Sequence, residues 1–240
     1  MNVFSDTNIG LSRVENQDRV RTVLLSENVA FAVICDGMGG ENAGSEASER
    51  AVNVIYDRIT KVFRKDFEGN AIKNLMLSAV TTANAVVYDV AWLNTAMQGM
   101  GTTCVAALRV GNILHVVSVG DSRAYLISDE ITQITKDHTI VMKMYENGEI
   151  SKEQLKNHPQ RNLITKAVGV AEQVIPDYFM VELPEEAAVV LCSDGLSNYC
   201  DESDIYSIVK GRAEDKVCPE LIKIALKNGG SDNITVAMIK

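Results

Sequence analysis

The chain has 240 residues, of which 46% are apolar and 23% are charged, so it can bury a sizeable core as one globular domain. Its 32 acidic residues exceed its 23 basic residues and give a formal charge of -9. This charge repels phosphate backbones and anionic lipid surfaces, so nucleic acid and membrane partners are not expected. An acidic chain can handle phosphate only where arginine, lysine or bound metal ions concentrate positive charge locally.

Short apolar runs bounded by turn residues predict five β-strands. These runs are residues 29–36, 102–110, 112–119, 187–194 and 233–240. The step from Arg109 to Asn112, with Gly111 inside it, separates two of the runs and predicts a hairpin turn. The strands on either side of this turn should therefore be antiparallel.

Two stretches between the first two predicted strands have apolar residues at helical spacing. They extend from Ala47 to Val62 and from Ile72 to Val87, and they predict two amphipathic helices of about six turns each. Two shorter helices are predicted over residues 205–209 and 221–226, with a stop at the glycine pair 229–230.

Strands in hairpins, with helices grouped between them, predict an α+β sandwich of layers rather than a doubly wound parallel sheet. The polar segment at about 139–161 lies between strand regions and has only a short helical pattern, so it predicts a surface flap inserted into the fold. Because the chain has no repeat, low-complexity tract or Pro-rich linker, we expect one domain over residues 1–240.

The cysteines and the N-terminus predict a cytoplasmic protein. The five cysteines include no Cys-x-x-Cys pair and mostly lie in apolar runs, which is typical of buried free thiols in a reducing compartment. The first residues lack the basic and apolar segments of a leader, and no stretch approaches the roughly 18 apolar residues of a membrane span. With three histidines in the chain, any metal should be held by oxygen rather than as structural zinc.

Four aspartates stand at the ends of predicted strands: Asp36, Asp121 and Asp194 after a strand, and Asp232 before one. Carboxylates at the rim of a sheet can converge from separate strands, and they repel one another unless cations neutralise them. Oxygen ligands favour Mg²⁺ or Mn²⁺ over zinc or copper. A single strand-end aspartate more often caps a turn, so the prediction of a metal site depends on the recurrence.

Two further features support phosphate chemistry. The glycines after Asp36 would let the backbone approach an ion, so the Gly37 carbonyl could join the coordination. Near the N-terminus, Arg13 stands five residues before Asp18 and combines a planar donor fork for phosphate with another carboxylate. A tight turn and a solvated surface arginine are the alternative interpretations of these two features.

Seven short motifs follow one another over nearly the whole chain. They are Ser12-Arg13 with Glu15-Asn16-Gln17-Asp18, Asp36-Gly37-Met38-Gly39-Gly40, Gly101-Thr102-Thr103, Gly120-Asp121-Ser122-Arg123-Ala124-Tyr125, Asp137-His138, Ser193-Asp194-Gly195 and Ser231-Asp232-Asn233. Each is weak alone, but in this order they resemble the metal-dependent protein phosphatases of type 2C, the PPM family, in their compact bacterial form.

The resemblance implies a four-layer α-β-β-α sandwich, in which two central antiparallel sheets are flanked by helices and a binuclear metal site lies in a cleft at one end. It implies hydrolysis of phosphoserine and phosphothreonine on proteins by a metal-activated water. The expected partners are phosphorylated proteins and a bacterial Ser/Thr kinase that the enzyme opposes, and we expect a monomer.

The resemblance also implies the ligands of the two Mn²⁺ or Mg²⁺ ions. Asp36 would bridge both ions, the carbonyl of Gly37 would bind one, and Asp194 and Asp232 would bind the other. Asp121, together with Asp194, would hold a third and weaker metal.

Two more residues are assigned by the resemblance: Asp18 would act through metal-bound water, and Arg13 would bind the substrate phosphate. Larger eukaryotic relatives have a histidine where this chain has Met38, so the donor of the leaving-group proton is unassigned. His138 is expected to anchor the flap rather than to catalyse.

Three alternative functions would also use part of this pattern. A metal-dependent nuclease or small-molecule phosphoesterase would also use paired metals, but the net charge disfavours nucleic acid. A binding module with a dead site would not need the repelling carboxylates of Asp36, Asp194 and Asp232. A regulator of sigma-factor switches would generally lack Arg13 and the flap.

Overall fold

The computed structural model describes residues 1–40, 43–155 and 157–240. Within these ranges the chain forms eleven strands. The strands are β1 (Val3–Asn8), β2 (Asp18–Ser26), β3 (Val29–Met38), β4 (Gly101–Thr102), β5 (Cys104–Val110), β6 (Ile113–Val119), β7 (Arg123–Ile127), β8 (Ile131–Gln133), β9 (Asp177–Glu182), β10 (Ala188–Cys192) and β11 (Ile234–Ile239). The helices are α1 (Ala43–Val62), α2 (Gly69–Leu93), α3 (Ile140–Glu146), α4 (Lys152–Leu155), α5 (Asp194–Ser197), α6 (Glu202–Gly211) and α7 (Glu214–Lys227), and a 3-10 turn spans Thr95–Met97.

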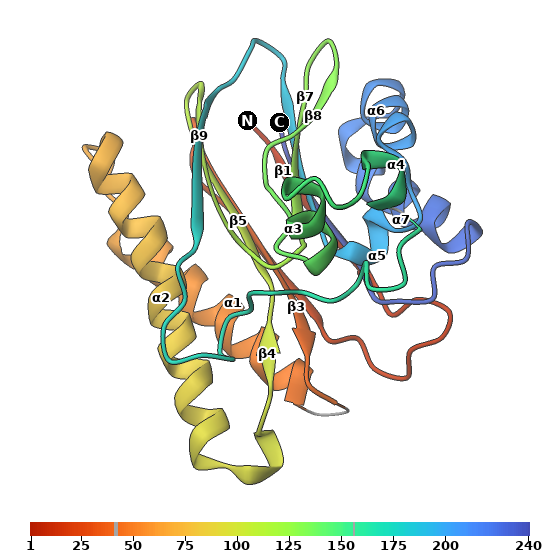
Figure 1. The fold of residues 1–240 in the computed structure, drawn as a ribbon. Coiled ribbons are helices and arrows are strands. Elements are labelled where there is room, and N and C mark those ends of the chain that lie inside the picture. The colour runs from red at the N-terminus through yellow and green to blue at the C-terminus, as the bar shows by residue number, and fades with distance from the viewer. Residues whose placement is uncertain (41–42, 156) are drawn as a thin grey trace.

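The strands form two antiparallel sheets. One has the order β1-β11-β10-β7-β8, and the other has the order β2-β3-β5-β6-β9 with β4 paired to β3. Helices α1 and α2 lie on one side of the sheets, and α6 and α7 lie on the other (Figure 1). The predicted four-layer α-β-β-α sandwich is confirmed.

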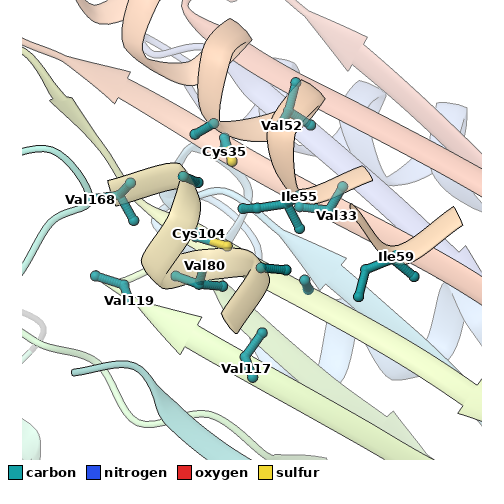
Figure 2. Close-up of a cluster of buried hydrophobic side chains, with 14 of the residues drawn as sticks. Val33, Cys35, Val52, Ile55, Ile59, Val80, Cys104, Val117, Val119 and Val168 are labelled. Atoms are coloured by element: carbon teal, nitrogen blue, oxygen red, sulfur yellow. The ribbon is translucent and has the colours of Figure 1, made fainter. Parts of the chain in front are cut away.

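Strand β3 shows why the central strands are continuous apolar runs. Successive side chains of a strand point to opposite faces, and both faces of β3 are buried. Val33 and Cys35 pack with α1 and α2, as Figure 2 shows, whereas Ala32 and Ile34 lie in the core between the sheets. A fully buried strand needs no polar alternation, so only its length and its flanking turns mark it as a strand.

All five predicted strands are confirmed, as β3, β5, β6, β10 and β11, and the hairpin between β5 and β6 is antiparallel. The prediction of one strand over 102–110 was partly wrong, because Thr103 interrupts it between β4 and β5. No apolar run in the sequence predicts β1, β2, β7, β8 or β9. Four of these are edge strands of their sheets, with mixed burial and no clean apolar run.

Both long helices are confirmed, and α2 extends beyond the predicted end at Val87 to Leu93. The expectation that no segment has the length and composition of a membrane span was wrong for α2. By these two criteria alone, α2 is long and apolar enough to cross a membrane. Its apolar face, which includes Met76, Val80 and Ala83, is buried in the core with α1. The core helix of a soluble protein passes the same test, so its composition alone does not indicate a span.

The predicted flap corresponds to α3, α4 and the residues around them, apart from residue 156, which lies outside the described residues. These helices lie on the side of the molecule that carries α5 and α6, and Met142 and Leu155 line one pocket with Ser197 (Figure 1). The two ends of the segment meet, because Thr139 and Ile164 form an antiparallel bridge and the Ile140 N–H donates to the Leu163 carbonyl at 2.9 Å. The chain thus leaves the sandwich and returns to it at the same place.

Candidate metal centre

The two sheets bring the predicted aspartates to one end of the sandwich. Asp18 begins β2 and lies directly opposite Asp36 of β3. Asp194 begins α5 just after β10, and Asp232 precedes β11. A cavity of about 680 Å³ is lined by a group that includes the predicted ligands and the predicted phosphate clamp: Arg13, Asp36, Gly37, Asp121, Asp194 and Asp232.

Burial and mutual repulsion raise the pKa values of these carboxyls. Burial raises the pKa of Asp36 well above its ordinary value, and the charges of Asp18 and Asp194 raise it further. Burial is also the main cause that raises the pKa of Asp18 and of Asp194 to about 6, and that of Asp121 to about 8. A cluster of this kind holds protons near neutral pH unless cations replace them.

One side-chain oxygen of Asp18 accepts no hydrogen bond within the described residues. The Ser193 hydroxyl donates to Oδ2 at 2.7 Å, but Oδ1 is buried and accepts no hydrogen bond from the described part of the chain. Leaving a buried carboxylate oxygen without a donor is costly. Water bound to a nearby cation would supply that donor, and the surrounding carboxylate and carbonyl oxygens are the ligands that a hard divalent ion prefers. By the type of their donor atoms, the residues present therefore fit Mn²⁺ or Mg²⁺.

Arg13 forms a bidentate ion pair with Asp232. Its Nε donates to Oδ1 at 2.7 Å and its Nη2 donates to Oδ2 at 2.8 Å. The hydrogen bond to Asp232 is the largest cause that raises the pKa of Arg13, and the charges of Asp36 and Asp194 add to it. Over residues 1–40, 43–155 and 157–240, no three or more His, Cys, Asp or Glu side chains are grouped so as to hold a metal ion. The predicted ligands share one cavity, but Asp232 binds Arg13.

Two asparagines that the analysis of the sequence did not single out position the site. Asn198 donates to Asp194 Oδ2 at 3.0 Å. Asn233 donates to the carbonyls of Ile9 and Glu15, and its own oxygen accepts from the Gln17 N–H at 2.8 Å. Asn233 thereby ties the loop that carries Arg13 to the segment that carries Asp232. Its place in the Ser231-Asp232-Asn233 motif was the available signal.

His138 connects the segment after β8 to the loop before Asp121. Its Nδ1 accepts from the Gly120 N–H at 3.0 Å, so the neutral ring carries its proton on Nε2, which lies 3.1 Å from Asp177 Oδ2. Burial lowers the pKa of His138, and the neighbouring charge of Lys166 lowers it further. These contacts are structural, and they join His138 to residues outside the flap, so its role as an anchor of the flap stays a prediction.

The raised carboxyl pKa values predict how the stability of the metal-free protein depends on pH. The folded pKa values of about 6 for Asp194 and about 8 for Asp121 lie above the ordinary value of 3.8, so the native state retains protons that the unfolded chain releases. The free energy of unfolding is therefore highest at low pH, falls as the pH rises above about 3.8, and levels off above about 8. We expect the free energy of unfolding in EDTA, measured with urea, to fall between about pH 5.5 and pH 8.5.

The Asp121→Asn variant serves as the control for this prediction. It removes the carboxyl whose pKa is raised to about 8. The decline in the free energy of unfolding above about pH 7 should therefore become shallower. Stability in EDTA that stays level or increases over this range would contradict the prediction.

The sequence matches the model of the family described as Protein phosphatase 2C over residues 12–214. The serine/threonine phosphatase stp of Listeria monocytogenes is 34% identical over 236 residues, which cover 98% of this chain and 93% of that protein. The crystal structure of the serine/threonine phosphatase Stp1 from Staphylococcus aureus has a TM-score of 0.92 at 33% identity and covers 99% of this chain and 94% of that chain. The catalytic domain of the phosphatase PstP, crystallised with two manganese ions, has a TM-score of 0.85 at 32% identity and covers 99% and 96%. The chain belongs to the protein phosphatase 2C family.

Proposed function

We propose that the chain hydrolyses phosphoserine and phosphothreonine on proteins at a binuclear Mn²⁺ or Mg²⁺ centre. The observation that carries the proposal is the cavity in which partly buried carboxylates from both sheets meet one arginine. Membership of the protein phosphatase 2C family supports the same reaction. The chemistry requires concentrated positive charge in an acidic protein, and such a cluster is where divalent ions would supply it.

The proposed ligand set is the one that the motifs imply. Asp36 would bridge the two ions, the Gly37 carbonyl would bind one, and Asp194 and Asp232 would bind the other. A third, weaker ion would be held by Asp121 together with Asp194. When bound, the ions would lower the pKa of a water between them and offset the negative charge of the phosphoryl oxygens.

The remaining steps depend on side chains of this chain. The guanidinium of Arg13 would bind two phosphate oxygens and orient the phosphoryl group. Asp18 would orient water through Oδ1, because Ser193 donates to its other oxygen. Asn198 would hold Asp194 in place through the 3.0 Å hydrogen bond that its side-chain amide donates to Asp194 Oδ2. No covalent phosphoenzyme is required.

We further propose a single catalytic domain over residues 1–240 that works as a monomer in the cytoplasm. The five cysteines are all buried and free, which suits a reducing compartment. The flap at about 139–161 would contribute to selectivity, since loops over a fixed site can vary without disturbing the core. The substrates of the enzyme would be phosphorylated proteins, so a Ser/Thr kinase must supply them.

The test is phosphate release from a phosphothreonine peptide with Mn²⁺, with EDTA, and with Mn²⁺ restored. We expect turnover with Mn²⁺, a loss of at least about 10³-fold in EDTA, and recovery on restoring the metal, because a Lewis acid contributes several kcal/mol to the barrier. Plasmid DNA and a small aryl phosphate are the comparison substrates. Faster cleavage of DNA would favour a nuclease, and no turnover by folded, metal-loaded protein would favour a binding module.

A further inference from the structure

Arg13 and Asp232, which the proposed function assigns to different ligands, bind each other in this structure. Two parallel hydrogen bonds of 2.7 and 2.8 Å join the fork of Arg13 to both oxygens of Asp232. The side chain of Arg13 is 56% exposed and that of Asp232 is 32% exposed, so the pair is accessible to solvent. In this conformation the phosphate clamp and one proposed metal ligand are both occupied.

The guanidinium of Arg13 acts here as the local cation of the acidic cluster. It lines the same cavity as Asp36 and Asp194, and the charges of both carboxylates raise its pKa. A divalent ion held by Asp232 would bring a second positive charge to the carboxylate that Arg13 already binds, and like charges repel. Metal and Arg13 therefore compete for Asp232.

The backbone permits Arg13 to leave without unfolding the loop. Asn233 and the Gly230 carbonyl hold the loop on both sides of Arg13, through Ile9, Leu11, Glu15 and Gln17. These bonds do not involve the side chain of Asp232. Between them, Val14 is 91% exposed, so a change in the position of Arg13 need not disturb the core.

We infer that Asp232 holds Arg13 until a divalent ion enters, so that metal binding releases the arginine that grips the substrate phosphate. This inference rests on the proposed function and adds an order of events to it, in which metal binds before phosphate. Binding sites that compete for one residue are coupled reciprocally, and typical couplings are about 5-fold to 150-fold in affinity. Weakening the pair should therefore strengthen metal binding.

The first test is calorimetric titration of the metal-free protein with Mn²⁺, without substrate. We expect the Mn²⁺ affinity to rise about tenfold or more in Arg13→Gln. Arg13→Lys keeps the charge but loses the bidentate fork, so we expect its affinity to lie between those of Arg13→Gln and the wild type. Arg50→Gln removes an arginine that pairs with Glu46 on α1, and it controls for net charge alone.

The second test follows the Arg13 Nε–H resonance by ¹⁵N NMR, with the signal identified by its loss in Arg13→Lys. In the metal-free protein the ion pair should give a resolved, slowly exchanging Nε–H signal. Addition of Mg²⁺ should shift or broaden it. An Nε–H signal unchanged by saturating Mg²⁺, or equal Mn²⁺ affinities of Arg13→Gln and the wild type, would overturn the inference. Neither measurement uses turnover, so a failure of the proposed function would be seen separately.

Discussion

Replacing Asp36 with Asn will lower kcat/KM for a phosphothreonine peptide by at least about 10³-fold while it stabilises the metal-free protein. The two effects have one origin, because burial and the charges of the neighbouring carboxylates raise the pKa of the same carboxyl that would bridge the metals well above its ordinary value. The backbone of Asp36 is held independently of its side chain. Its N–H donates to the Thr103 hydroxyl at 3.1 Å, and its carbonyl accepts from the Thr103 N–H at 2.8 Å. The variant should therefore fold.

The measurement combines steady-state kinetics in Mn²⁺ with thermal unfolding in EDTA. Asp57→Asn is the matched control, since Asp57 lies on the exposed face of α1 and pairs with Lys61. It should change neither quantity appreciably. Wild-type activity in Asp36→Asn, or a lower Tm of that variant in EDTA, would contradict the assignment of Asp36 as a metal ligand that is repelled when no metal is present.

Gly37→Ala should destabilise the protein by about 3 kcal/mol and also weaken metal binding. A Cβ at this position would lie 2.1 Å from the carbonyl oxygen of Gly44 and 2.9 Å from that of Gln17. Both neighbours are backbone atoms, so no side chain can rotate away to make room. Relief requires α1 to move from β3, and that movement would displace Asp36 and the Gly37 carbonyl together.

Urea unfolding of Gly37→Ala is compared with that of Gly211→Ala. Gly211 ends α6, and a Cβ there would meet nothing within 4 Å, so the control should change stability by less than about 0.5 kcal/mol. Calorimetry with Mn²⁺ then measures the effect on the site. A loss at Gly37 no larger than that at Gly211 would show that the close approach of α1 and β3 can relax without cost.

Much of the fold could be predicted from local patterns. The buried strands β3 and β10 are apolar runs that end at an aspartate, and α1 and α2 have a helical apolar period, so each element carries its own signal. Edge strands such as β2 are only partly buried along most of their length and carry no such signal. They form because a neighbouring strand offers hydrogen bonds, which is information that lies elsewhere in the chain.

The sequence by itself determined which carboxylates stand at strand ends. Its motifs also determined the phosphatase family to which the chain belongs. Only the tertiary structure decided how the oxygens of these carboxylates are paired. Asp18 lies opposite Asp36 because of the register of β2 and β3, and Arg13 meets Asp232 across 219 positions of sequence. The physical reason is that residue type and spacing specify an element and its buried face, whereas side-chain partners depend on register and packing between distant segments.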